Sequence, residues 1–542
     1  MRQRIIEGGI YFLLLFTPLA FGGVERWAVG VLQVVAGVVF VAWAWEDWPR
    51  TRRPSRGVGR PGRRERTLLI GSLCLFAVLV LVQLVPLPPG WIRRIAPATH
   101  GLYLQTVPGV DAGRRFDAAD LESWLLVQAS GKGDQVRAEA VRETGPVPRE
   151  DPEGESGWGR PLVGGLQTPA DGTSRRTPGV GWRTLSIYPF ATRENLAIFL
   201  CYAGLFVVVA DRFGNRKRCM RLLGVMVLAG FMVSLFGILQ KLGSNDKLYW
   251  IRETDKKFFF GPFINRNSFA AFAGTILPVA ICLSLASLRQ LRGGRQDVLP
   301  RFIFFTAASV AMAGGVFYSL SRGGMIAVGC SVLVVAGLLL YYGRRGLELG
   351  MLGLLLVLAV GFLIWIGPGE VAERVGTLSR GASEPSLTSR VRAWRQAGRL
   401  VADHPLVGTG LGTFRFAFQR DQPPDPVWWD VAHNEYLELV CDTGLAGAAL
   451  FLVGLAAYLR LVMRPGQVRG RTGPFIYTGL VAGMAGLLLH SAVSSNLQVP
   501  ANGLLLVILG GQLMGFICSQ EKPDPTPPEA GAGRRHAAPG AP

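Results

Sequence analysis

Ionisable residues are scarce in this sequence, and the centres of its long apolar runs contain almost no acidic side chains. Charged residues make up 17% of the 542 residues, and the mean hydropathy is +0.31. Transporters and lipid flippases typically place ionisable residues within their membrane spans and use paired broken helices. The scarcity therefore argues against transport, which stays a remote alternative.

Metal-binding and cofactor motifs are also missing. The seven cysteines lie in or beside apolar runs, and none forms a Cys-x-x-Cys pair. This arrangement indicates neither a disulfide framework nor a zinc site. The glycine-rich segment 408–412 follows His404-Pro405 instead of a strand, so it does not predict a dinucleotide site. We expect no metal and no cofactor.

Long apolar runs are what the sequence has in abundance. A run of ~20 apolar residues crosses a hydrocarbon core of ~30 Å. The runs predict an all-α polytopic membrane protein with about twelve transmembrane helices. They lie near residues 5–23, 27–45, 67–86, 190–210, 219–240, 267–287, 302–319, 323–342, 348–367, 434–459, 475–493 and 500–518.

The distribution of arginine predicts the orientation of these spans. Five short basic links fall on alternate sides of the span count and therefore on one face, which the positive-inside rule makes cytoplasmic. They are residues 46–66, 211–218, 288–301, 343–347 and 460–474. Both termini are then cytoplasmic as well. The formal charge of +20 reflects this topology, so we expect no nucleic-acid partner.

The same count divides the chain into six segments. Within the segment 87–189, residues 131–176 are rich in Gly, Pro and charge of both signs, which predicts disorder. The segments are helices 1–3 in 1–86, an external and partly disordered insertion in 87–189, helices 4–9 in 190–367, a large external loop between spans 9 and 10 in 368–433, helices 10–12 in 434–519, and a disordered cytoplasmic tail in 520–542.

The external loop 368–433 holds eight arginines on the side where short loops are normally poor in them, which indicates a bound anion. Residues 386–403 have the periodicity of an amphipathic helix. Val391, Trp394, Ala397, Leu400 and Val401 share its apolar face, and Arg392, Arg395 and Arg399 share the opposite face. Arg390 falls on the apolar side, so it is either paired or functional, unless it snorkels to water from the first turn.

Two other external positions gather polar residues. Arg322 lies in a tight turn between two predicted spans, on the side that the charge rule disfavours. Asn265, Arg266 and Asn267 meet the membrane at the same face. For Asn267 and Ser268 the favoured interpretation is a helix cap.

His433 is the third candidate. It follows Trp428 and Trp429, which mark the membrane interface, and Asp430, which we expect to cap the next helix. In the first helical turn the helix dipole disfavours imidazolium. A neutral imidazole can accept a proton, so His433 suits a general base. The alternative is a structural role in which His433 holds the loop on the helix start.

Four segments in order resemble the O-antigen ligase and polymerase family, membrane glycosyltransferases that use polyprenyl-diphosphate-linked glycans. The likeness covers about residues 190–518. Its segments are Gly261-Pro-Phe-Ile-Asn-Arg-Asn-Ser-Phe-Ala, Ser321-Arg-Gly-Gly, Arg390-x-x-x-Trp394 leading into His404-Pro-Leu-Val-Gly-Thr-Gly, and His433-Asn-Glu-Tyr with Gly444 and Gly447.

The resemblance implies about a dozen spans, a late periplasmic loop, two essential arginines and an essential histidine, which match Arg322, Arg390 and His433. It further implies a metal-independent transferase in the bacterial inner membrane, with its active site facing the periplasm. Direct attack by the acceptor hydroxyl would make the transfer inverting. In this assignment the two arginines hold the diphosphate and His433 activates the acceptor. Further substrate contacts are expected from Asn265, Arg266, Asn267, Asn434 and Arg392.

The expected partners are a polyprenyl-diphosphate-linked glycan donor, a lipid or glycan acceptor, and the membrane. Ligation onto a lipid core, polymerisation of repeat units and glycosylation of a protein all use the same donor chemistry. The sequence leaves these three activities open.

Overall fold

The computed structural model describes residues 2–51, 63–106, 182–243, 247–253, 258–344, 346–366, 385–422 and 429–520. The stretch predicted to be disordered (131–176) and the tail after Gln520 lie outside them. The chain divides into two compact units, Met1–Leu84 with Ser186–Pro542, and Val85–Leu185. Across the described residues all regular structure is helical, which confirms the predicted all-α class.

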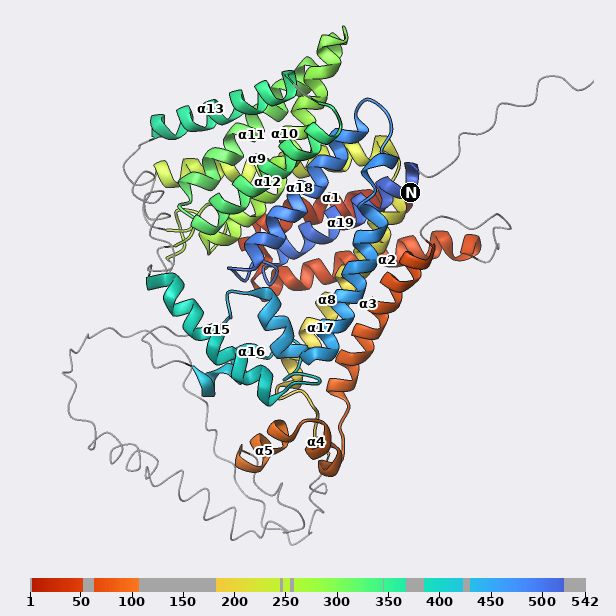
Figure 1. Cartoon of the computed structure of the whole chain (residues 1–542), viewed down its shortest axis with the longest axis vertical. Helices are drawn as coiled ribbons and strands as arrows, with labels where there is room; N and C mark the ends of the chain where they lie inside the picture. Colours follow the sequence, from red (N-terminus) through yellow and green to blue (C-terminus); the bar gives the residue numbers. More distant parts are fainter. Residues whose placement is uncertain are drawn as a thin grey trace, which may run out of the picture. The chain divides into compact units, whose positions relative to one another are not determined.

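In the described part of the first unit, twelve helices each fall on one predicted span (Figure 1). They are α1 (Arg2–Leu19), α2 (Arg26–Thr51), α3 (Arg63–Leu84), α8 (Pro189–Arg212), α9 (Arg216–Leu242), α10 (Arg266–Arg292), α11 (Leu299–Tyr318), α12 (Arg322–Tyr341), α13 (Leu347–Ile366), α17 (Glu435–Val462), α18 (Gly473–Ser491) and α19 (Pro500–Gln520).

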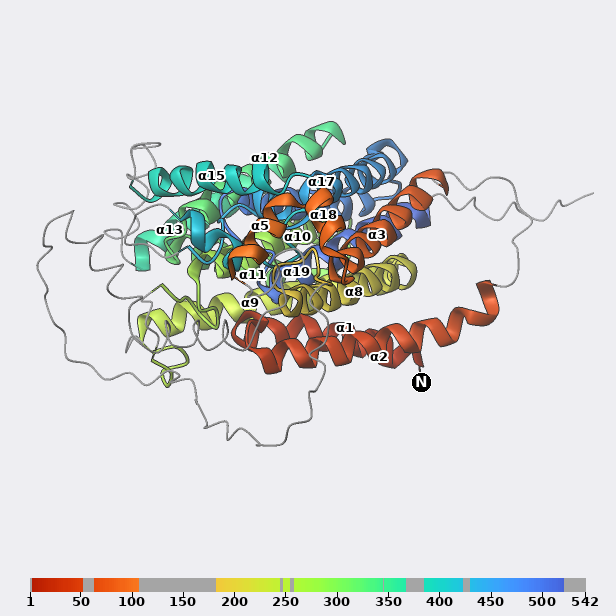
Figure 2. The ribbon, with the colours of Figure 1, turned by 90° about the horizontal axis from the view of Figure 1, so that it is seen from below.

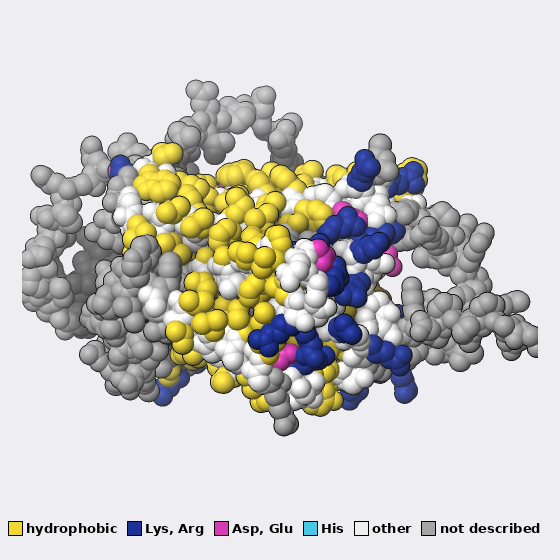
Figure 3. All heavy atoms as spheres, turned by 90° about the horizontal axis from the view of Figure 1, so that it is seen from above, with side chains coloured by type: hydrophobic (Ala, Val, Ile, Leu, Met, Phe, Trp, Pro, Cys, Tyr) yellow, Lys and Arg dark blue, Asp and Glu magenta, His cyan; other side chains and the backbone are white. Residues whose placement is uncertain are grey.

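Ten of these helices are long and apolar enough to cross a membrane, counted over the described residues. The chain is therefore a polytopic membrane protein. Figure 3 shows the matching surface, a broad band of hydrophobic side chains beside a group of Lys and Arg. Helices α1 and α13 are not among the ten. Helix α1 carries Arg2, Arg4 and Glu7 in its first two turns, and the apolar part found in α13, Leu347–Leu358, is shorter than a membrane span. Membrane crossing by these two helices stays a prediction.

Helix α10 forms the centre of the unit and is buried throughout its apolar length. Helices α18 and α19 lie beside it, with α1 and α2 to one side and α12 and α17 to the other (Figure 2). Gly479 and Gly483 of α18 allow close approach, because a Cβ at Gly483 would lie 2.5 Å from the carbonyl oxygen of Thr275 on α10. Small residues four apart are a common means of packing membrane helices tightly.

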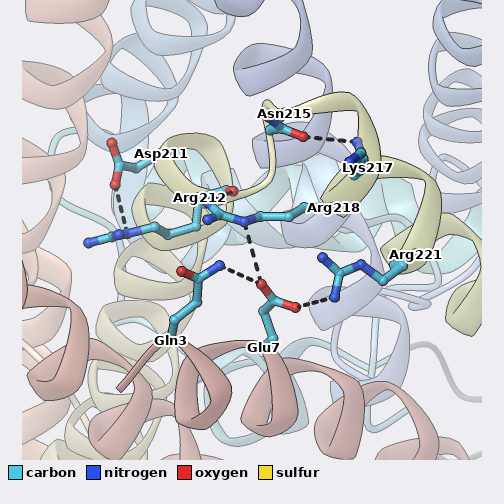
Figure 4. Close-up of polar contacts among 8 residues, drawn as sticks. All are labelled: Gln3, Glu7, Asp211, Arg212, Asn215, Lys217, Arg218 and Arg221. Carbon is cyan, nitrogen blue, oxygen red and sulfur yellow. Dashed lines mark hydrogen bonds and ion pairs between the residues drawn. The ribbon is translucent and has the colours of Figure 1, made fainter. Parts of the chain in front are cut away.

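A buried carboxylate fastens α1 to α9. Glu7 accepts a hydrogen bond from Gln3 at 2.9 Å and pairs with Arg218 at 3.4 Å and Arg221 at 3.1 Å (Figure 4). The Glu7 side chain is 12% exposed, whereas Arg221 is 59% exposed. The buried charge of Glu7 is therefore stabilised by its partners, whereas Arg221 is stabilised largely by water.

We expect Glu7→Ala to lower the free energy of unfolding by about 1–2 kcal/mol, because it removes charge-assisted hydrogen bonds from a half-buried site. The measurement is the thermal unfolding midpoint of the purified protein in detergent. Asp297→Ala is the matched control, because it breaks an exposed pair with Arg295 and should leave the midpoint unchanged. Equal midpoints for Glu7→Ala and wild type would contradict the stabilising role.

The second unit contains α4 (Pro89–Ile95) and α5 (Pro97–Thr106) in its described part. Leu87 and Arg183 pair through their backbones, and the Tyr103 hydroxyl donates to the carbonyl of Thr184. These contacts bring together the two ends of the insertion.

Candidate active site

The amphipathic helix predicted within residues 368–433 is α15 (Pro385–Asp403). Ala393, Ala397 and Leu400 are buried and pack with Cys441 and Leu437 of α17. Arg392, Arg395 and Arg399 are exposed, as predicted. Hydrophobic packing thus attaches the amphipathic helix to the start of α17 and presents Arg390 in its first turns on the inner side.

Helices α10 and α12 begin close together. The side chain of Asn265 accepts from the amide of Asn267 and is the N-cap of α10, so the predicted caps at Asn267 and Ser268 are wrong. The extended backbone at Asn265 allows its side chain to turn back onto the helix. Ser321 caps α12 and donates to the side-chain oxygen of Asn267 at 2.8 Å. Arg322 therefore starts its helix beside the start of α10.

Arg322 lies close enough to Arg390 for its charge to act on the Arg390 guanidinium, although the two positions are 68 apart in sequence. Burial, and then the charge of Arg322, lower the pKa of the Arg390 guanidinium. The Nη1 atom of Arg390 donates to the carbonyl of Val493 at 2.7 Å. Among the described residues no carboxylate forms an ion pair with Arg390. Two adjacent cations, one of them half-buried, make a site that favours an anion.

His433 lies just before α17 and not within its first turn. Asn434 is the N-cap, and its side-chain oxygen accepts from the amides of Tyr436 and Leu437 at 3.1 Å each. The predictions that Asp430 caps this helix and that His433 is helical are therefore wrong. His433 has a φ of +50°, a conformation uncommon for residues other than glycine. Its ring packs edge-on against Trp429, with centroids 5.8 Å apart.

A cavity of about 300 Å³ opens beside His433. Its lining brings His433 together with Asn265, with Phe21 after α1, and with residues of the loop between α18 and α19. That loop contributes Ser494, Ser495, Gln498 and Val499. The same loop carries the carbonyl of Val493 that binds Arg390, so it connects the arginine pair to the cavity.

The remaining substrate-binding candidates have structural contacts of their own. The Arg266 guanidinium lies 5.1 Å from the centre of the Phe258 ring, and the Asn434 oxygen is used in capping. Arg392 points to the exposed face of α15. Their contacts with substrate stay predictions.

The glycine-rich segment 408–412 supports the site. Gly444 has a φ of +64° and interrupts α17, and the interruption is filled by the segment after α15. The amide of Leu445 donates to the carbonyl of Pro405, and that of Gly412 to the carboxylate of Asp442 at 2.6 Å. Gly444 thus packs against a loop, because a Cβ there would lie 2.4 Å from the carbonyl oxygen of Leu406.

Sequence reasoning missed two parts of the site, the 492–499 loop and the carboxylates of Glu435 and Glu438. Glu435 accepts from the amides of Leu497 and Gln498. Glu438 accepts from the amide of Ala432 and from the side chain of Gln498. Their signal in the sequence is a pair of acidic residues at the start of an apolar run. Within the described residues no group of three His, Cys, Asp or Glu side chains could hold a metal ion.

A family model described as O-antigen ligase matches residues 307–452. The chain carries an O-antigen ligase family domain. The match runs from within α11 to residue 452 in α17 and includes Arg322, Arg390 and His433, which confirms the resemblance over this part of the chain. No match was found among curated proteins.

The O-antigen ligase domain and the membrane helices together support a membrane protein of glycosyltransferase type. Members of the O-antigen ligase family are implied to use polyprenyl-linked glycans.

Proposed function

We propose that the protein transfers a glycan from a polyprenyl-diphosphate carrier to an acceptor hydroxyl at the periplasmic face of the bacterial inner membrane. The observation that carries the proposal is the adjacency of Arg322 to the half-buried Arg390 within the O-antigen ligase domain. Guanidinium groups suit phosphate oxygens and stay charged at any relevant pH. A departing diphosphate is an anion that this pair would hold.

In this reaction the acceptor oxygen attacks the anomeric carbon of the glycan while His433 takes the hydroxyl proton. The bond between the anomeric carbon and the diphosphate oxygen breaks, and the polyprenyl diphosphate leaves with the electron pair. Arg322 and Arg390 stabilise the charge that develops on it. Direct attack by the hydroxyl inverts the anomeric configuration. His433 lines the cavity, so the acceptor hydroxyl is assigned to that side.

Among activities of this class we favour ligation, because the matching family model is described as an O-antigen ligase. Polymerisation and protein glycosylation remain alternatives with the same donor chemistry. The length of the accumulated glycan separates the first two. Loss of a ligase leaves full-length chains on the lipid carrier, whereas loss of a polymerase leaves single repeat units.

Deletion of the gene in its source cells tests the proposal against transport. We expect lipid-linked glycan to accumulate on the external face, where an impermeant glycosidase added to spheroplasts can digest it. A flippase defect would leave the same material on the cytoplasmic face and protected. Accumulation only in the protected pool would contradict a transferase that works outside.

The topology of α15 is tested by cysteine labelling. Gly398 is exposed, and Gln296, next to Arg292 at the end of α10, is exposed on the side predicted to be cytoplasmic. An impermeant maleimide should label Gly398→Cys in intact cells and Gln296→Cys only after lysis, above the background of the native cysteines. Labelling of Gly398→Cys only after lysis would place the arginines and His433 on the cytoplasmic side.

A further inference from the structure

Ala432, the residue before His433, is held by side chains from two helices. Its carbonyl accepts from the indole N–H of Trp394 on α15 at 2.7 Å, and its amide donates to the carboxylate of Glu438 on α17 at 3.1 Å. Ala432 is 2% exposed, so water does not compete for these bonds. Both peptide planes that flank Ala432 are fixed, and the second of them contains the backbone nitrogen of His433.

The carboxylate of Glu438 also binds a residue on the other side of the cavity, Gln498. One oxygen of Glu438 accepts from the amide of Ala432, and the other accepts from the side chain of Gln498 at 2.6 Å. Gln498 and His433 both line the cavity. Glu438 itself is not among the lining residues, and it is 8% exposed. A single buried carboxylate therefore links the segment before α17 to the loop between α18 and α19.

The backbone of His433 needs such support. A φ of +50° is unfavourable for a residue with a Cβ, and such conformations persist where the surroundings determine them strongly. Asn434 then starts α17 directly. Trp394 and Glu438 hold Ala432 by hydrogen bonds, and we call this pair of contacts the clamp. Asn434 caps α17 on the other side of His433, so the backbone of His433 has little freedom. The clamp therefore sets the direction of the imidazole.

We infer that Glu438 is a positioning residue that aims the His433 imidazole at the acceptor hydroxyl, with Trp394 as its partner in the clamp. The inference rests on the role proposed for His433 and adds no chemical step. Glu438 acts through hydrogen bonds to its neighbours and not through its charge. In metal sites, the groups that orient a ligating imidazole are worth about 10–100-fold in activity, and we expect a comparable effect for the imidazole of His433.

Two substitutions separate hydrogen bonding from charge. In Glu438→Gln the side-chain carbonyl still accepts from the amide of Ala432, and its NH₂ group can donate to Gln498 once that amide rotates. Both links survive without the charge. In Glu438→Leu neither link survives, and a buried amide at Ala432 loses its partner.

The first readout is the rate of transfer at saturating substrate, measured with the full-length protein. We expect Glu438→Leu to lower kcat by about 10–100-fold with KM nearly unchanged, since substrate contacts remain while the base is misaligned. Glu438→Gln should keep kcat within about threefold of wild type. Glu348→Leu is the matched control and should keep the wild-type kcat. Glu348 is a buried carboxylate bound to Arg289, at the end of α10 that lies far from Asn265.

The second readout does not depend on activity. Diethyl pyrocarbonate modifies accessible neutral imidazoles, and mass spectrometry gives the rate for the peptide containing His433, with that of His100 as internal reference. Glu438→Leu should change the relative rate at His433, whereas Glu438→Gln and Glu348→Leu should not. If Glu438→Leu fails to insert, Trp394→Phe tests the other arm, since it keeps the ring and removes the N–H.

Three results would overturn the inference. The first is a wild-type kcat in correctly inserted Glu438→Leu, and the second is a Glu438→Gln variant as inactive as Glu438→Leu. The third is an unchanged rate of His433 modification in Glu438→Leu. If Glu438→Leu fails to insert, Trp394→Phe takes its place in the first and third comparisons. Failure of the proposed function is distinguishable, because wild-type protein would then show no transfer, or His433→Ala would transfer as fast as wild type, while the modification rates still reported the hydrogen bonds of Glu438 and Trp394 to Ala432.

Discussion

His433→Ala is expected to lower turnover by roughly 10²–10⁴-fold, the usual worth of a general base. The imidazole lines the cavity and is the proton acceptor assigned to the hydroxyl. Donor binding should survive, because the diphosphate contacts belong to Arg322 and Arg390. The measurement is single-turnover transfer alongside equilibrium binding of the lipid-linked donor. Cells with this variant should accumulate lipid-linked glycan while making normal amounts of inserted protein.

Two amide variants decide between proton transfer and a structural role at this position. Asparagine and glutamine donate and accept hydrogen bonds but do not take up the proton, so both His433→Asn and His433→Gln should be nearly inactive. His100→Ala, in α5 of the other unit, is the control and should be fully active. High activity of either amide variant, or loss of donor binding in parallel with rate, would remove the general-base role.

Arg322→Lys and Arg390→Lys are each expected to lower kcat/KM by about 10²–10³-fold, comparable to the loss of one donor from an anion-stabilising site. An ammonium keeps the charge but cannot form the planar two-point contact with phosphate oxygens. At Arg390 the lysine would also lose the geometry of the bond to Val493. The measurement is the rate of transfer together with the affinity for the lipid-linked donor.

The matched control for the arginine pair is Arg399→Lys. Arg399 lies on the exposed face of α15, opposite the packed side, and its replacement should leave both rate and affinity unchanged. Full activity in both Arg322→Lys and Arg390→Lys would contradict a diphosphate site at this pair. Weakened donor binding in both variants, with Arg399→Lys unaffected, is the expected pattern.

The membrane helices and α15 could be predicted from sequence because their signals are local. An apolar run has to be helical in lipid, where every backbone polar group needs a partner within the segment. The amphipathic period placed the start of α15 within one residue, at 386 against Pro385. The position of Arg390 on the inner face followed from the same helical wheel.

The start of α17 could not be predicted in this way. Asp430 and Asn434 are both good capping residues four positions apart, and local preference does not choose between them. The choice depends on the bonds of Ala432 to Trp394 and Glu438, which come from other parts of the fold. The helical position predicted for His433 was wrong for this reason.

The loop 492–499 was missed because its role depends on distant partners. Glu435 binds the amide of Leu497, 62 residues further along the chain, and Arg390 binds Val493, 103 residues away. A short polar loop between two apolar runs gives no local sign of such contacts. The same holds for the interruption of α17 at Gly444, whose free backbone groups are satisfied by the segment after α15.

The most direct measurement follows labelled glycan in membranes prepared from source cells that lack this protein. Purified wild-type protein is added, and label is followed from the solvent-extractable polyprenyl-diphosphate pool to the non-extractable acceptor pool. Label should move to the acceptor pool with wild-type protein and stay on the lipid with His433→Ala. Label that stays on the lipid with both proteins, or moves equally with both, would contradict a transferase that uses His433 as its base.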